Sequence, residues 1–104
     1  MIASPEYRYS IPGILKNAID WASRPYGDNA FDGKPVALMS ASISGLSGAR
    51  ARYHLCQSFV FLSMHPLNHP EVIMPFAGDN VDAKGNVTNE KTRQLILELL
   101  DALV

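Results

Sequence analysis

Two short polar segments hold most of the residues that could do chemistry. The first, Ser4–Ser10, offers a carboxylate, a guanidinium and two phenol rings within seven residues. The second, Ala41–Gly48, consists mainly of small residues, so a planar ring could lie close to its backbone. Both segments precede helical patterns, and unpaired N–H groups at a helix start attract electron-rich or anionic groups. From the residue types alone two interpretations stay open: a site for a ligand with electron-rich or anionic edges, or only a turn before a helix that begins with proline.

Other kinds of site have weaker support. Gly45–Gly48 does not match the G-x-S-x-G nucleophile elbow, and no convincing triad order accompanies it. His65 and His69 lie four residues apart, but Pro66 prevents a regular helix from aligning them. The single cysteine, Cys56, falls among the apolar positions of a helical pattern, which favours an inert core thiol. We therefore expect no side chain to act as a nucleophile and no metal site.

The composition restricts the class of protein. The 104 residues are 47% hydrophobic and 18% charged, which predicts one domain over residues 1–104. Nine basic and ten acidic residues leave a net charge of -1, which argues against nucleic-acid or membrane-surface binding. No apolar run reaches the ~20 residues that cross a bilayer, and the N-terminus lacks the pattern of a secretory signal. With only one cysteine, a cytoplasmic location is expected.

Apolar spacing predicts the elements that must position the two segments. Helical patterns cover residues 12–23, 47–64 and 88–103, with Ser10 and Thr88 as expected caps. In the first pattern the apolar positions share one face that we expect to be buried: Ile14, Leu15, Ala18, Ile19 and Ala22. Residues 26–34 and 78–86 are expected to be loops.

Short apolar runs between the helical patterns predict strands. Val36–Met39 and Val72–Met74 do not alternate with polar residues, as is typical of strands buried on both faces, and residues 2–3 resemble the end of a third strand. Strands that alternate with helices predict an α/β fold with a parallel sheet. Ligands of such sheets bind beyond the carboxyl ends of the strands, where both polar segments fall.

The residues of the first segment and of the helix after it resemble a known signature. Pro5–Gly13 (P-E-Y-R-Y-S-I-P-G), followed by Leu15–Trp21 (L-K-N-A-I-D-W), is similar to the P-E-Y-N-x-S-x-P-G-x-L-K-N-A-I-D-W pattern of NADPH-dependent FMN reductases. This flavodoxin-like family includes bacterial chromate and quinone reductases. Further on, G-A-R at residues 48–50 and Y-H-L at 53–55 resemble the family's G-A-R-x-x-Y-H-L-R-Q helix start. The resemblance covers nearly the whole chain.

The resemblance implies a cofactor and a reaction. The cofactor would be FMN and the co-substrate NAD(P)H, with electrons passing on to quinones, chromate or similar acceptors. The cofactor performs the difficult step, and the protein positions and tunes it. By residue-to-residue match, the flavin would contact the loop after the first strand and a serine of the next loop: Pro5, Glu6, Tyr7, Arg8, Tyr9 and Ser42.

The resemblance also implies an incomplete fold. The chain matches the third to fifth strands of a truncated flavodoxin-like three-layer sandwich, and the family's first two strands and phosphate-holding loop are missing. Two alternatives to a reductase therefore stay open. The chain could be a non-catalytic remnant that binds flavin poorly, or a subunit that needs association to complete its site. Arg8 also stands where the family usually has asparagine, and Cys56 where it often has arginine.

A homo-oligomer, either a dimer or a tetramer, is the expected assembly. The family's chromate reductases join subunits through an arginine, a tyrosine and a glutamate, which Arg50, Tyr53 and Glu71 match. An arginine–carboxylate pair with a phenol makes a directional link at an interface. The first strand is also expected to lie at an open side of the sheet, where its unpaired backbone groups favour pairing with a strand of another chain.

Overall fold

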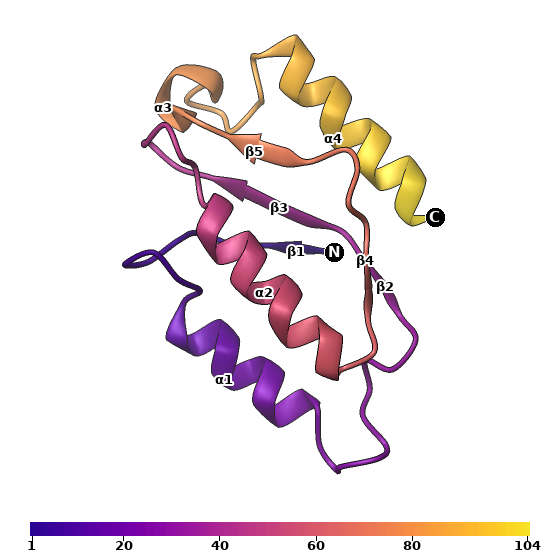
Figure 1. The fold of residues 1–104 in the computed structure, drawn as a ribbon. Coiled ribbons are helices and arrows are strands. Elements are labelled where there is room, and N and C mark those ends of the chain that lie inside the picture. The colour runs from indigo at the N-terminus through magenta and orange to yellow at the C-terminus, as the bar shows by residue number, and fades with distance from the viewer.

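A computed structural model describes residues 1–104 and shows strands alternating with helices, as predicted (Figure 1). The main sheet is parallel, with its three strands in the order β1 (Ile2–Ala3), β3 (Leu38–Ala41) and β5 (Val72–Met74). The long helices are α1 (Gly13–Ala22), α2 (Ala49–Phe61) and α4 (Glu90–Leu103). None of the helices combines the length and apolar character that a bilayer crossing requires.

The strand register determines which connecting segments meet. Leu38 pairs with Ile2, and Ala41 pairs with Met74 at the far end of the sheet. Because all three strands are parallel, their carboxyl ends lie along one edge, as in other open α/β sheets. The segments that begin after Ala3, Ala41 and Met74 therefore leave the sheet as neighbours.

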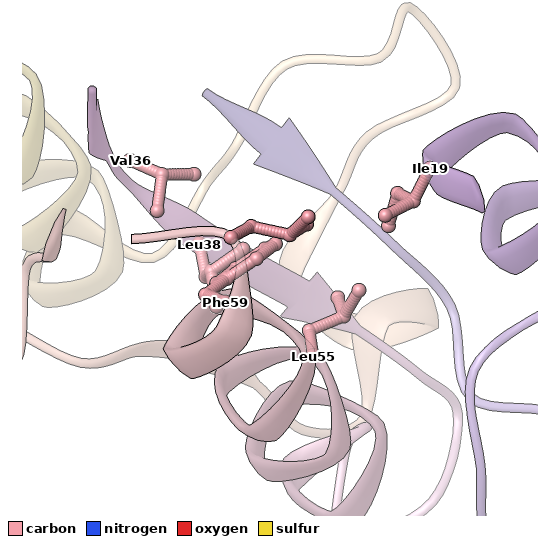
Figure 2. Packing of buried hydrophobic residues seen from close by; sticks show 6 residues of the cluster. Ile19, Val36, Leu38, Leu55 and Phe59 are labelled. Carbon is pink, nitrogen blue, oxygen red and sulfur yellow. The ribbon is translucent and has the colours of Figure 1, made fainter. Parts of the chain in front are cut away.

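Successive side chains near the centre of the sheet point to opposite faces, which creates two cores. Val36 and Leu38 belong to the cluster on the face covered by α1 and α2, which is completed by Ile19, Leu55, Phe59 and Leu62 (Figure 2). Ala37 joins Val72 and Leu99 of α4 in the second cluster. The two clusters confirm that this run of residues is buried on both faces.

The predicted strand Val36–Met39 is split in the structure. β2 (Pro35–Val36) pairs in parallel with β4 (His65–Pro66), whereas β3 pairs with β1 and β5. The change of partner occurs at Ala37, whose carbonyl accepts a hydrogen bond of 2.8 Å from the Ile2 amide. β4 escaped prediction because a two-residue strand containing proline carries no periodic signal.

Three local predictions were wrong. Ser10 does not cap α1, because its Oγ lies 2.9 Å from Nδ1 of His54, and Pro12 takes the cap position. Asn89 replaces Thr88 as the cap of α4, and its Oδ1 accepts a hydrogen bond of 3.0 Å from the Thr92 amide. The predicted loop at residues 78–86 includes most of a short helix, α3 (Ala77–Asn80).

The apolar face predicted for α1 is only partly covered. Ile19 is buried and Leu15 packs against the first core, but Ile14 is 87% exposed, and Ala18 and Ala22 are exposed as well. The helix lies beside α2, at the margin of the sheet, so only one side of its apolar stripe meets the core (Figure 1). Trp21, at the end of this helix, is 70% exposed.

Candidate functional site

The first predicted segment closes into a tight turn after β1. Tyr7 and Ser10 exchange two backbone hydrogen bonds: the Tyr7 amide donates to the Ser10 carbonyl at 2.9 Å, and the Ser10 amide donates to the Tyr7 carbonyl at 3.1 Å. Between them, Arg8 and Tyr9 have φ values of 50° and 68°, in the left-handed region that residues with side chains rarely adopt. The turn presents both tyrosine rings to solvent, with 62% of Tyr7 and 67% of Tyr9 exposed.

Glu6 directs its carboxylate toward the start of α2. Oε2 accepts a hydrogen bond of 3.1 Å from the Ala51 amide, and Oε1 lies 3.6 Å from Nη1 of Arg50. A carboxylate is stabilised at a helix N-terminus by the helix dipole. The Arg50 guanidinium also lies over the Tyr9 ring, with 3.8 Å between Cζ and the ring centroid. These contacts join the first segment to the start of α2.

Buried hydroxyl groups hold the second segment in place. Ser40 donates from Oγ to the Ser47 carbonyl at 2.6 Å, and Ser47 donates from Oγ to the Met74 carbonyl. Both serines are buried, and their hydroxyls form hydrogen bonds with backbone carbonyls of the loops. The hydrogen bond to the Met74 carbonyl joins the loop after β3 to the end of β5.

Ser42 is bonded to the segment after β5. Its amide donates to the Met74 carbonyl at 3.1 Å, and its carbonyl accepts from the Ala77 amide at 2.9 Å. Its Oγ accepts from the Ser44 amide at 3.2 Å, so the side chain bends back over its own loop. Ser42 thus links the second segment to the segment after β5, and its hydrogen bonds do not reach the Tyr7–Ser10 turn.

Phe76, in the segment that begins after Met74, was missed by sequence reasoning. It has a φ of 49° and is half-exposed, and its ring lies within 3.4 Å of the position that a Cβ on Gly45 would occupy. Asn80 holds this strained backbone by donating from Nδ2 to the carbonyls of Pro75 at 2.9 Å and Phe76 at 3.2 Å. Its place in the sequence, two positions after a strand predicted to be buried, was the signal that could have found it.

Strained backbone collects at this edge of the sheet. Of the five non-glycine residues with positive φ, four follow the carboxyl ends of the strands: Arg8, Tyr9, Ser47 and Phe76. Such residues cost about 1–3 kcal/mol each and cluster at ligand-binding sites. The carboxyl edge of the sheet is therefore the candidate site.

Arg50, Tyr53 and Glu71 do not form one group within the chain. Glu71 Oε1 accepts from Nη1 of Arg52 at 2.9 Å and from the Tyr53 hydroxyl at 3.2 Å, whereas Arg50 faces Glu6 and Tyr9. Arg52 was not singled out from the sequence. It is buried, and its Nε has no hydrogen-bond partner. Its place three residues before Leu55, on the buried side of α2, was the signal that could have found it.

An apolar hollow lies on the α4 side of the same edge. Its volume is about 310 Å³. The lining residues come from the ends of the three strands, the start of the first segment and α4: Ala3, Ser4, Pro5, Met39, Ser40, Ala41, Val72, Met74 and Ile96. Pro5 therefore belongs to both the turn segment and this hollow.

Comparison with known proteins identifies relatives of the chain. The family model for NADPH-dependent FMN reductase matches residues 1–79. An NAD(P)H-dependent FMN reductase of Pseudomonas aeruginosa is 52% identical over 103 residues, which cover 99% of this chain and 55% of that protein. A 2-hydroxy-1,4-benzoquinone reductase of a Burkholderia species is 39% identical over 101 residues, covering 97% of this chain and 55% of that protein.

A solved structure shows the same fold. FerB, a flavoenzyme NAD(P)H:(acceptor) oxidoreductase from Paracoccus denitrificans, matches with a TM-score of 0.85 and 37% identity, covering 97% of this chain and 56% of that one. The match confirms the predicted flavodoxin-like α/β fold with a parallel sheet. The chain spans about half the length of the curated relatives it matches. On the family match and these identities, the chain belongs to the NADPH-dependent FMN reductase family.

Proposed function

We propose that this chain acts in an FMN-dependent NAD(P)H oxidoreductase that passes electrons to quinones. The observation that carries the proposal is the meeting of the three segments after β1, β3 and β5 at one edge, with four strained residues among them. The names of the relatives support the cofactor and the acceptor class. When bound, FMN would accept hydride from the nicotinamide and pass the electrons on, while the protein binds and orients both partners.

The residues at this edge fit the flat ring of a flavin. The turn supplies the exposed rings of Tyr7 and Tyr9, and the second segment supplies a backbone of mainly small residues, with Ile43 and Leu46 as its exposed apolar side chains. We assign Pro5, Tyr7, Arg8, Tyr9 and Ser42 to flavin contact. Glu6 is left out of this set, because its carboxylate accepts a hydrogen bond from the Ala51 amide at the start of α2.

Flavin titration tests the proposal directly. FMN is added to the purified full-length chain, and binding is followed by the quenching of flavin fluorescence. We expect saturation at one FMN per chain, followed by NADPH oxidation when a benzoquinone is added. Riboflavin, which lacks the phosphate, separates the contribution of the ring from that of the phosphate. Absence of saturable binding by either compound would contradict the proposal.

Chromate is a second proposed acceptor, carried only by the resemblance to the family's chromate reductases. Its test is the loss of chromate absorbance in the presence of the FMN-loaded chain and NADPH. The quinone assay serves as the positive control. Quinone turnover without loss of chromate would restrict the acceptors to quinones.

Association with another polypeptide is the second candidate function. Ile14 and Trp21 are exposed on α1, Val60 and Phe61 are exposed on α2, and the apolar hollow opens beside α4. Exposed apolar surface on both faces of the sheet supports association with another chain. We propose a homodimer or homotetramer, with Arg50, Tyr53 and Glu71 as candidate contacts. Two alternatives stay open. A non-catalytic remnant would bind flavin poorly, and a partner-dependent subunit would bind flavin only after association.

Sedimentation measurements separate these alternatives. Equilibrium runs with and without FMN should show an oligomer, and Tyr53→Phe should weaken it without unfolding the chain. A monomer at every concentration would contradict the assembly proposal. Flavin binding that begins only at concentrations where the oligomer forms would favour the partner-dependent subunit.

A further inference from the structure

Arg50 links the residue before the Tyr7–Ser10 turn with a residue inside it. Its Nη1 lies 3.6 Å from the Glu6 carboxylate, and its Cζ lies 3.8 Å from the centroid of the Tyr9 ring. A guanidinium is planar, so it can stack on an aromatic ring while its edge faces a carboxylate. Glu6 is itself held by the Ala51 amide, and its side chain is only 12% exposed. The three side chains thus form a chain of contacts between α2 and the turn.

The turn needs this support because its residues do not favour their conformation. Turns with two consecutive positive φ values are ordinarily built from asparagine, aspartate and glycine. Here Arg8 and Tyr9 take these places. Backbone in such a region persists only when surrounding contacts hold it there. Tyr9 receives such a contact from Arg50, and the Glu6–Ala51 hydrogen bond anchors the chain just before the turn.

We propose that Glu6 and Arg50 are positioning residues, which hold Tyr9 and the turn in the conformation that receives the flavin and do not touch the flavin themselves. The proposal rests on the proposed FMN binding. It also gives Arg50 a function within one chain, apart from the subunit contact predicted from the family. Lysine can keep the charge at position 50 but cannot reproduce the planar stacking, so the two parts of the contact can be separated.

The first experiment measures the turn without flavin. Trypsin cleaves after Arg8 when the turn opens, and cleavage after Lys84, in a distant exposed loop, serves as an internal standard. Wild type, Glu6→Gln, Arg50→Met and Arg50→Lys are compared as full-length chains. We expect the ratio of the two cleavage rates to rise about fivefold in Arg50→Met, the size expected for loss of a partly exposed cation–π contact together with an ion pair, and to rise less in Glu6→Gln, which loses only the ion pair. The cleavage ratio of Arg50→Lys should lie between those of wild type and Arg50→Met.

The matched control is Arg93→Met. Arg93 lies on α4, is largely exposed, and pairs with Glu90 at 3.9 Å, far along the sequence from the turn. Its removal deletes the same kind of side chain, so the cleavage ratio should stay at the wild-type value. Urea unfolding of each variant measures any general loss of stability separately, because an exposed site such as Lys84 is cleaved without unfolding of the chain.

The second experiment measures FMN affinity in the same variants and in Tyr9→Leu. Arg50→Met should raise the dissociation constant about fivefold in the wild-type background, again from the size of the lost contact. It should have little further effect when Tyr9 is already leucine. This non-additivity is the mark of two residues that act through one another, and a general structural effect would not produce it.

Each outcome decides the proposal. Equal cleavage ratios in all variants, or additive effects of Arg50→Met and Tyr9→Leu on affinity, overturn it. A wild-type chain that binds no flavin overturns the proposed function, and the cleavage ratios alone then show whether Glu6 and Arg50 hold the turn. If Arg50→Met changes the sedimentation of the chain and Tyr53→Phe reproduces its loss of affinity, Arg50 acts in a subunit contact, and the positioning role is overturned.

Discussion

Gly48 packs against Ser40 so closely that a Cβ on the glycine would lie 2.8 Å from the serine Cβ. Gly48 also has a φ of 83°, which costs a glycine little. The close approach brings the start of α2 against the end of β3, where the Ser40 hydroxyl reaches the Ser47 carbonyl at 2.6 Å. Glycine is therefore required here for two independent reasons, its conformation and its lack of a side chain.

Gly48→Ala should separate these two requirements when it is compared with Gly85→Ala. Gly85 has a nearly identical φ of 85°, but a Cβ there meets nothing within 4 Å. We expect Gly85→Ala to lower the free energy of unfolding by about 1 kcal/mol for conformation alone. Gly48→Ala should lower it by about 2–4 kcal/mol, because overpacking is added. Urea unfolding checks both values, and equal losses would mean that Ser40 moves aside freely.

Phe59→Ala should be among the most destabilising single changes in the chain. Phe59 is 1% exposed and lies in the cluster of Figure 2, so its truncation leaves a cavity that costs about 3–5 kcal/mol. Its neighbour Val60 is 81% exposed, and Val60→Ala should change the free energy of unfolding by less than about 0.5 kcal/mol. Comparable losses at the two positions in urea unfolding would show that α2 is rotated from its described orientation.

Tyr7→Ala should weaken FMN binding about three- to tenfold, which is the range for loss of an aromatic contact. Flavin fluorescence titration measures the change, and Tyr26→Ala is the matched control. Tyr26 is another exposed tyrosine, in the loop after α1, and its ring is paired with Phe61 at 6.3 Å. Affinity unchanged in a folded Tyr7→Ala chain would remove Tyr7 from the site.

Asp82 should make the free energy of unfolding depend on pH in the acidic range. Hydrogen bonds from the Asn86 side chain and backbone hold the pKa of the Asp82 carboxyl below its ordinary value. A carboxyl group with a lowered pKa in the folded state contributes stability above its unfolded pKa and loses it as pH falls through the folded pKa. The difference in unfolding free energy between wild type and Asp82→Asn should therefore be constant above about pH 5 and shrink below about pH 4.

Urea unfolding at a series of pH values tests this prediction. Asp101→Asn, which changes an exposed aspartate on α4, is the control for a general change of charge. A difference between wild type and Asp82→Asn that does not vary with pH would mean that the lowered pKa makes no contribution to stability.

The order of the main strands and the long helices was predictable from local patterns, and the same patterns singled out two of the segments that make up the candidate site. Val72–Met74 was found as a strand with its observed bounds, because a short apolar run without polar alternation is typical of a strand buried on both faces. Ser4–Ser10 and Ala41–Gly48 were singled out because ligands of parallel sheets bind beyond the carboxyl ends of the strands. The family signature in Pro5–Trp21 was readable without coordinates, since it depends only on residue order.

Only the tertiary structure decided which side chains meet across long stretches of sequence. The Glu6–Ala51 hydrogen bond spans 45 residues, and nothing in the local spacing selects that partner. Arg50 and Arg52 are two positions apart on α2, so they point in directions that differ by about 200°. Glu6 and Tyr9 contact Arg50, whereas Glu71 forms an ion pair with Arg52. This division depends on how α2 is rotated against the sheet, which local sequence patterns do not determine.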